Sequence, residues 1–264
     1  MRKASEKDYD RVIKYLSSAI SECLYLYIDI KQYRFENSNI GVWIEEKNGK
    51  IEFVSMKYYD SFQLYCKGLP DQHIIDDVAN LISLNPVSMI EGRKDIIEFL
   101  CKIVPGYETS YGVIYQIDDE GYYENNSEDV TVASEDDAYD IANLICSNKD
   151  IGGYYSVDGL AKQLADRIRS GVGRSIIIKR DGKVCAHIAT YAEADDVAVI
   201  SGLIVHSKGG KSDDYLKIRS YLVKLLREEN KKAYGYVNAD RLIKFHDKIH
   251  KRCCEYGKMV ISKS

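Results

Sequence analysis

An apolar run of nine residues that starts at Val197 is the feature that most constrains the fold. The run (VAVISGLIV, 197–205) is rich in β-branched residues and too short for a typical helix, so it predicts a buried strand. A polar turn with two glycines follows at 206–212. Apolar residues then recur at helical spacing, namely Tyr215, Ile218, Leu222, Leu225 and Leu226. A glycine turn between a strand and a helix points backbone N–H groups and the helix dipole at an anion, so the stretch predicts a phosphate-binding turn.

The chain continues with a predicted strand at 233–237, a helix at 240–250 and a strand at 258–261. This order resembles the core of the GNAT superfamily of acyl-CoA-dependent N-acyltransferases. In that family the strand before the turn binds the pantetheine arm through its backbone, and the turn wraps the pyrophosphate. The resemblance implies an acyl-CoA site made of Leu203, Ile204, Val205, Lys208, Gly209, Gly210, Lys211 and Ser212.

The turn departs from the family pattern, which reads Arg or Gln, two residues, Gly, one residue, and Gly or Ala. Gly210 stands at the Arg or Gln position, Lys211 at the first glycine and Asp213 at the second. Lys208 and Lys211 would attract a pyrophosphate, whereas Asp213 and its neighbour Asp214 would repel one. An ordinary turn whose Asp residues cap the helix therefore stays an open alternative.

The chain also carries an internal repeat. Residues 44–58 (IEEKNGKIEFVSMKY) align without gaps on 177–191 (IIKRDGKVCAHIATY), which matches Gly49 with Gly182 and Tyr58 with Tyr191. Similar orders of strands and helices follow both copies, so a duplication is the better explanation. The sequence predicts two tandem GNAT-like α/β folds with mixed sheets, at 1–120 and 128–264, joined by an acidic linker at 118–129. The first fold lacks a glycine turn before its helix at His73, so we expect it to be a degenerate scaffold.

The remaining elements are predicted from periodicity. The Asn-Gly pair at 48–49 predicts a tight hairpin between the strands at 40–46 and 51–58. Residues 25–33 fit either a strand or a loop. Further strands are expected at 61–66, 87–90, 111–117 and 130–133, and helices at 7–20, 73–84, 93–103, 135–146 and 157–170.

The resemblance implies a base that deprotonates the amine and an acid that protonates the leaving thiolate. Glu193 is the first candidate for the base and His187 the second. For the acid, His246 occupies the position of a family tyrosine on the last helix, and Tyr256 and Tyr236 are the other candidates. Three of these residues have a structural alternative: a polar residue at a strand end for Glu193, a core histidine for His187 and a surface histidine for His246.

The segment 152–156 lies where the family often forms the wall of its acceptor site. Together with 171–175 and 187–193, it resembles a group of uncharacterised two-domain bacterial GNAT proteins. This resemblance brings no known substrate.

Composition limits the partners. Lys plus Arg number 37 against 41 Asp plus Glu, so neither nucleic acid nor an anionic membrane is an expected partner. The seven cysteines are scattered without a CxxC pair, so we expect no metal site. The sequence has no apolar run of about 18 residues and no signal-peptide core, which predicts a cytoplasmic protein.

The leading hypothesis is an N-acetyltransferase that moves an acetyl group from acetyl-CoA to a small amine. The alternative is a catalytically degenerate GNAT pair that serves as a CoA-binding regulatory or protein-interaction module. A third hypothesis, aminoacyl or peptidyl transfer, predicts a basic groove for a tRNA-like donor, and the acidic balance argues against it. A homodimer is left open.

Overall fold

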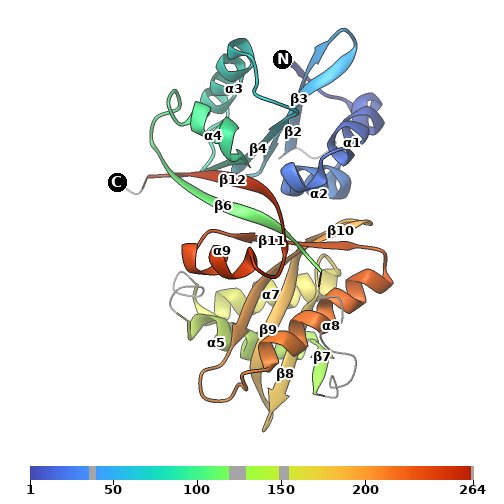
Figure 1. Cartoon of the computed structure of the whole chain (residues 1–264), viewed down its shortest axis with the longest axis vertical. Coiled ribbons are helices and arrows are strands. Elements are labelled where there is room, and N and C mark those ends of the chain that lie inside the picture. The colour runs from blue at the N-terminus through green and yellow to red at the C-terminus, as the bar shows by residue number, and fades with distance from the viewer. Residues whose placement is uncertain (36–39, 119–128, 149–154, 263–264) are drawn as a thin grey trace. The chain divides into compact units, whose positions relative to one another are not determined.

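The computed structural model describes residues 1–35, 40–118, 129–148 and 155–262. The chain forms two compact units: unit 1 contains residues 1–116 and 236–264, and unit 2 contains residues 117–235 (Figure 1). Each unit has parallel and antiparallel strand pairs with helices packed against them. The predicted α/β fold with a mixed sheet is therefore confirmed.

Unit 1 has the strand order β1-β2-β3-β4-β5-β12-β6. The strands are β1 (Arg2–Lys3), β2 (Ile40–Lys47), β3 (Lys50–Tyr58), β4 (Ser61–Cys66), β5 (Met89–Arg93), β6 (Tyr107–Ile117) and β12 (Lys251–Ile261). The helices are η1 (Glu6–Asp8), α1 (Tyr9–Ser17), η2 (Ile20–Glu22), α2 (Leu24–Tyr33), α3 (Gln72–Leu84), α4 (Lys94–Leu100) and α9 (Asp240–His246). Among the described residues of unit 1, β4 pairs with β5 in parallel, and the other neighbouring strands pair antiparallel.

Alternating residues of the unit 1 strands face two different layers of helices. Phe53 of β3 and Phe62 and Leu64 of β4 join one apolar cluster with α3 and α4, whereas α1 and α2 pack on β3 and β4 from the other side (Figure 1). Strand periodicity explains this division, since successive side chains point to opposite faces. The predicted hairpin is confirmed, with Asn48 at φ 51° and Gly49 at φ 74° in its turn.

The last strand of the chain completes the sheet of unit 1. β12 pairs antiparallel with β5 and with β6, and so lies between them. In the sequence this strand belongs to the second predicted fold, at 128–264. The predicted strand at 258–261 is also only the end of β12, which starts at Lys251. The division into two tandem folds at 1–120 and 128–264 stays a prediction, which rests on the internal repeat. Residues 119–128 of the predicted linker lie outside the described residues.

The segment 25–33 is helical, so the expectation of a strand or a loop was wrong. Its residues form α2, in which Leu24, Leu26, Tyr27, Ile28 and Ile30 are all buried. These apolar residues lie around most of the helix rather than along one stripe. Because periodicity appears only when one face is polar, the pattern of α2 did not indicate a helix.

Unit 2 has the strand order β11-β10-β9-β8-β7. The strands are β7 (Val130–Val132), β8 (Ser175–Arg180), β9 (Lys183–Glu193), β10 (Val197–Val205) and β11 (Lys232–Val237), whose last two residues are counted with unit 1. The helices are η3 (Glu135–Asp137), α5 (Ala138–Cys146), α7 (Val157–Ser170) and α8 (Asp214–Glu228). The hairpin β8–β9 repeats the turn of β2–β3, with Asp181 at φ 50° and Gly182 at φ 74°.

The two faces of the unit 2 sheet carry separate cores. Ile176 and Ile178 of β8 pack with α8, whereas Ile177 between them packs with α5 and α7. In the described part of unit 2, α8 therefore packs on one face of the sheet and α5 and α7 on the other, and β9 and β10 run between these layers. The predicted helix at 157–170 is confirmed at both ends; Ser156 caps it and Gly171, at φ 67°, ends it.

Candidate functional site

A β-bulge in β10 marks the centre of the candidate site. The register passes from Ser201 opposite Ala189 to Ile204 opposite His187, so three steps along β10 match two along β9. Gly202 lies in the bulge at φ 68°, a backbone conformation that glycine adopts without strain. Bulges bend a strand and leave backbone groups outside the ladder, and they occur often beside active sites.

His187 is bound to the bulge from β9. Its Nδ1 lies 2.9 Å from the carbonyl oxygen of Gly202, and its Nε2 lies 3.2 Å from Oγ of Ser175. Because a carbonyl oxygen only accepts, Nδ1 carries the proton and Nε2 accepts from the Ser175 hydroxyl. Burial lowers the pKa of His187 to about 4, so the imidazole is neutral at pH 7 and holds the bulge in place.

A cavity of about 170 Å³ opens beside the bulge. Its walls come from α5, α7, β9 and β10, and include Leu160, Leu164, Arg167, His187, Ala189, Tyr191, Ser201 and Gly202. The walls are mostly apolar and carry a few polar groups, as in small-molecule sites. Tyr155 also lines this cavity, whereas 152–154 of the predicted acceptor wall lie outside the described residues.

β10 and β11 pair in parallel only at their first residues. Val197, Ala198 and Val199 oppose Lys232, Ala233 and Tyr234, and β10 continues to Val205. The part of β10 that carries the bulge therefore lies beyond this paired segment. Leu203, Ile204 and Val205 of the predicted acyl-CoA site all lie there, and Ile204 is buried against α5 and α7.

The turn after β10 is held by hydrogen bonds between its own residues. The N–H groups of Lys208 and Gly209 point to Nδ1 of His206 at 3.3 and 3.0 Å, and Gly210 N donates to the His206 carbonyl oxygen at 2.8 Å. A Cβ at Gly210 would lie 2.2 Å from a Val205 methyl, so only glycine fits there. The side chains of Lys208 and Lys211 remain exposed.

A carboxylate of the chain itself occupies the start of α8. Asp214 is fully buried and accepts from Lys211 N at 2.7 Å and from two nitrogens of Arg180 at 2.5 and 2.6 Å. Burial acts to raise the pKa of Asp214, but the bonds from Arg180 and Lys211 outweigh it, so the pKa lies below its ordinary value. Asp214 thus places a carboxylate of the chain itself at the positive end of α8, beside the turn that is predicted to bind a pyrophosphate. Ser212 is exposed beside it.

Glu193 is the last residue of β9. Arg174 binds both its oxygens, at 2.9 and 2.8 Å, and Lys231 and Thr190 also bind it, at 2.7 and 2.5 Å. Burial acts to raise the pKa of Glu193, but these bonds outweigh it and the pKa lies below its ordinary value. The geometry supports an anchoring role, and the predicted role as a base stays a prediction.

The other three predicted catalytic residues lie in unit 1. The rings of Tyr236 and Tyr256 lie 6.1 Å apart, and burial raises the pKa of both, to about 12 for Tyr236. His246, on α9, packs on the rings of Tyr115 and His250 at 5.3 and 5.2 Å. Glu193 and His187 belong to unit 2.

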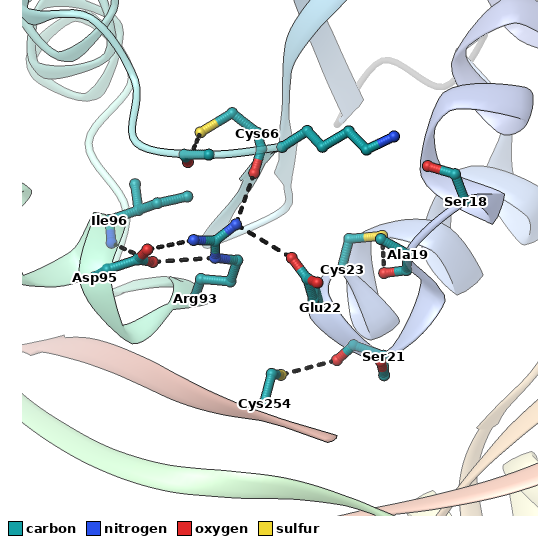
Figure 2. A network of polar contacts seen from close by, with 12 residues as sticks. Ser18, Ala19, Ser21, Glu22, Cys23, Cys66, Arg93, Asp95, Ile96 and Cys254 are labelled. Carbon is teal, nitrogen blue, oxygen red and sulfur yellow. Dashed lines mark hydrogen bonds and ion pairs between the residues drawn. The ribbon is translucent and has the colours of Figure 1, made fainter. Parts of the chain in front are cut away.

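Unit 1 also has a parallel strand pair, β4 with β5, and an arginine bridges the ends of these two strands. Parallel pairing of β4 with β5 ends at Leu64 and Gly92, and the next residue, Arg93, donates to the Cys66 carbonyl oxygen at 3.2 Å. Figure 2 shows that the same guanidinium is bound by Glu22, at 3.1 Å, and by Asp95. The role of the first fold as a scaffold stays a prediction.

Sequence reasoning missed several residues of the site. A glycine within a strand pattern signals a bulge, so Gly202 could have been found. The sequence carries no such signal for Ser175, Arg180 and Arg167. Ser175 and Arg180 reach the site through the pairing of β8 with β9, and Arg167 reaches it through the packing of α7 on the sheet. Within the described residues no group of three or more His, Cys, Asp or Glu side chains could hold a metal ion. No helix in that part of the chain is both long and apolar enough to cross a membrane.

No family model matches this sequence, and no curated protein matches it. Solved structures do. A Drosophila protein matches with a TM-score of 0.71 at 12% identity, over 99% of this chain and 98% of that one. A GNAT-family acetyltransferase from Colwellia psychrerythraea matches with a TM-score of 0.59 at 11% identity, over 99% of both chains. A tandem GNAT protein from the clavulanic acid biosynthesis pathway matches with a TM-score of 0.56 at 9% identity, over 98% of this chain and 97% of that one. At these identities the likeness is one of fold, and it confirms the resemblance predicted from the sequence.

Proposed function

We propose that this protein, whose chain has the GNAT fold, is an acyl-CoA-dependent N-acyltransferase that moves an acetyl group from acetyl-CoA to a small amine. The observation that carries the proposal is the bulge at Gly202, which His187 holds beside a cavity in unit 2. The cavity provides a place for the acceptor, and the part of β10 beyond its pairing with β11 provides a strand for the pantetheine arm.

The reaction forms a bond between the amine nitrogen and the thioester carbonyl carbon and breaks the bond from that carbon to sulfur. The nitrogen loses a proton, and the thiolate takes one up. Backbone N–H groups that a bulge frees from the ladder are suited to stabilise the oxyanion that develops on the carbonyl oxygen. Neutral His187 keeps these groups in place, and the predicted roles of Glu193, Tyr236, His246 and Tyr256 remain to be tested.

Groups of the turn at 206–213 act in opposite directions on a bound pyrophosphate. A pyrophosphate would compete with His206 for the N–H groups of Lys208 and Gly209, and Asp214 adds a negative charge nearby. The exposed ammonium groups of Lys208 and Lys211 favour the opposite outcome. The balance can be measured.

Thermal unfolding with acetyl-CoA tests this balance. A ligand that binds only the folded chain stabilises it by about 2.7 kcal/mol at a hundredfold excess over its Kd. We expect acetyl-CoA to raise the Tm, S-acetylpantetheine, which lacks the diphosphate, to raise it less, and Lys211→Glu to reduce the acetyl-CoA effect. Lys224→Glu, an exposed change near the other end of α8, is the matched control and should leave it unchanged. No rise with millimolar acetyl-CoA would contradict the proposal and would leave a catalytically degenerate GNAT pair that serves as a protein-interaction module.

A substitution in the bulge tests the position of the chemistry. Gly202→Val places a β-branched residue at φ 68°, with its Cβ 3.3 Å from Cε1 of His187, so the bulge cannot keep its shape. We expect acetyl transfer, measured as release of CoA thiol, to fall about 100-fold, the usual effect of losing an oxyanion donor. Gly171→Val, at φ 67° with open space around it, introduces the same kind of backbone strain away from the site and should keep activity. Equal activity in both variants would place the chemistry elsewhere.

A further inference from the structure

We infer that the acceptor is a small amine that also carries a carboxylate, as an amino acid does, and that Arg167 binds this carboxylate. The inference rests on the function proposed above and adds the chemical class of the acceptor. Its basis is the charge on the walls of the cavity beside Gly202.

Arg167 is a cation that no carboxylate of the described residues neutralises. It forms no ion pair in that part of the chain, and its guanidinium lies over the ring of Tyr191, 4.6 Å from the centroid. Arg169, two residues after Arg167 on α7, differs: it forms ion pairs with Glu135 at 2.5 Å and with Asp166 at 2.9 Å. Two arginines of the same helix turn therefore differ in this respect, and the unpaired one is the one that lines the cavity.

The rest of the cavity adds no charge that opposes Arg167. Among the described residues that line it, no carboxylate is present, and His187 is neutral at pH 7. Leu160 and Leu164, which are both buried, form apolar walls of the same cavity. A planar guanidinium binds a carboxylate through two parallel hydrogen bonds, which are stronger in a partly desolvated site than in water.

The same positive charge suits the chemistry of the amine. A nearby cation disfavours the protonated form of a bound amine, and only the neutral amine attacks a thioester. An acceptor with its carboxylate at Arg167 and its amine toward Gly202 would gain from both effects. A simple amine would gain only from the second, so the carboxylate should determine which amines are used.

The test compares amino acids with the amines that remain when the carboxylate is removed. The pairs are leucine with 3-methylbutylamine and phenylalanine with 2-phenylethylamine, each assayed with acetyl-CoA and the full chain by release of CoA thiol. We expect kcat/KM to be about 10- to 100-fold higher for the amino acid of each pair, as for other hydrogen bonds to charged groups. Arg167→Gln should remove this ratio, and Arg169→Gln, which changes an exposed arginine of the same helix turn, should keep it.

The outcomes separate this inference from the proposed function. Equal kcat/KM for both members of each pair would overturn the inference and leave acyl transfer standing. If neither member releases thiol, binding of leucine and phenylalanine is measured by calorimetry. Binding that Arg167→Gln abolishes and Arg169→Gln retains would then support Arg167 as a carboxylate site while the transferase proposal fails. No binding, or binding that survives Arg167→Gln, would overturn the inference.

Discussion

Replacing Arg180 by methionine is expected to lower the free energy of unfolding by about 3 kcal/mol, the usual effect of removing one partner of a buried ion pair. Asp214 is fully buried, and Arg180 binds both of its carboxylate oxygens. Without the guanidinium, this carboxylate keeps the Lys211 N–H group and the positive end of α8 but loses its main counter-charge. Urea unfolding monitored by circular dichroism measures the loss.

Two further variants show whether the buried charge is the cause. Adding Asp214→Asn to Arg180→Met removes the uncompensated charge and keeps an oxygen that can accept from Lys211 N, so it should recover part of the stability. Arg227→Met breaks an ion pair with Asp118 in which both side chains are about half exposed, and should cost much less. An equal loss in Arg180→Met and Arg227→Met would show that the burial of Asp214 does not matter.

The stability of the protein is expected to fall as the pH drops from 7 to 4, and His187 should contribute a large share. Its pKa is about 4 in the folded chain because of burial, against an ordinary value of 6.5. Between these values the unfolded chain binds a proton that the folded chain does not, so acid favours unfolding. The contribution of His187 is fully present above pH 6.5 and is lost as the pH falls toward 4. It amounts to about 3 kcal/mol, since one pKa unit corresponds to about 1.4 kcal/mol.

The variant His187→Gln removes this titration. We expect it to be less stable than the wild type at pH 7, because it loses the shape and bonds of the imidazole, but to lose less stability on acidification. Urea unfolding at several pH values from 4 to 7 gives both curves. His73→Gln changes an exposed histidine on α3 and should follow the wild type. Parallel curves for His187→Gln and the wild type would show that the fold does not exclude the charged imidazole.

The sequence by itself determined the elements that depend on local chemistry. Asn48 and Gly49 specified one hairpin turn, and Asp181 and Gly182 specified the same turn in the repeat. The continuous apolar run of β10 and the helical spacing of α7 and α8 were also sufficient, because a run of this kind is typical of a buried strand and each of the two helices has a buried side and a polar side. The order of these elements carried the resemblance to the GNAT fold, and the solved structures confirm it.

Tertiary structure alone decided three features, each because it depends on residues far apart in the sequence. α2 is buried around most of its surface, so its periodicity was hidden. β12 completes the sheet of unit 1 because strand pairing depends on which edge is open, and no local pattern records that. The side-chain contacts beside the turn after β10 also depend on the fold, because Arg180, which comes from β8, binds Asp214 at the start of α8. A sequence pattern shows which groups could bind an anion, and only the packed chain shows which of them its own side chains already satisfy.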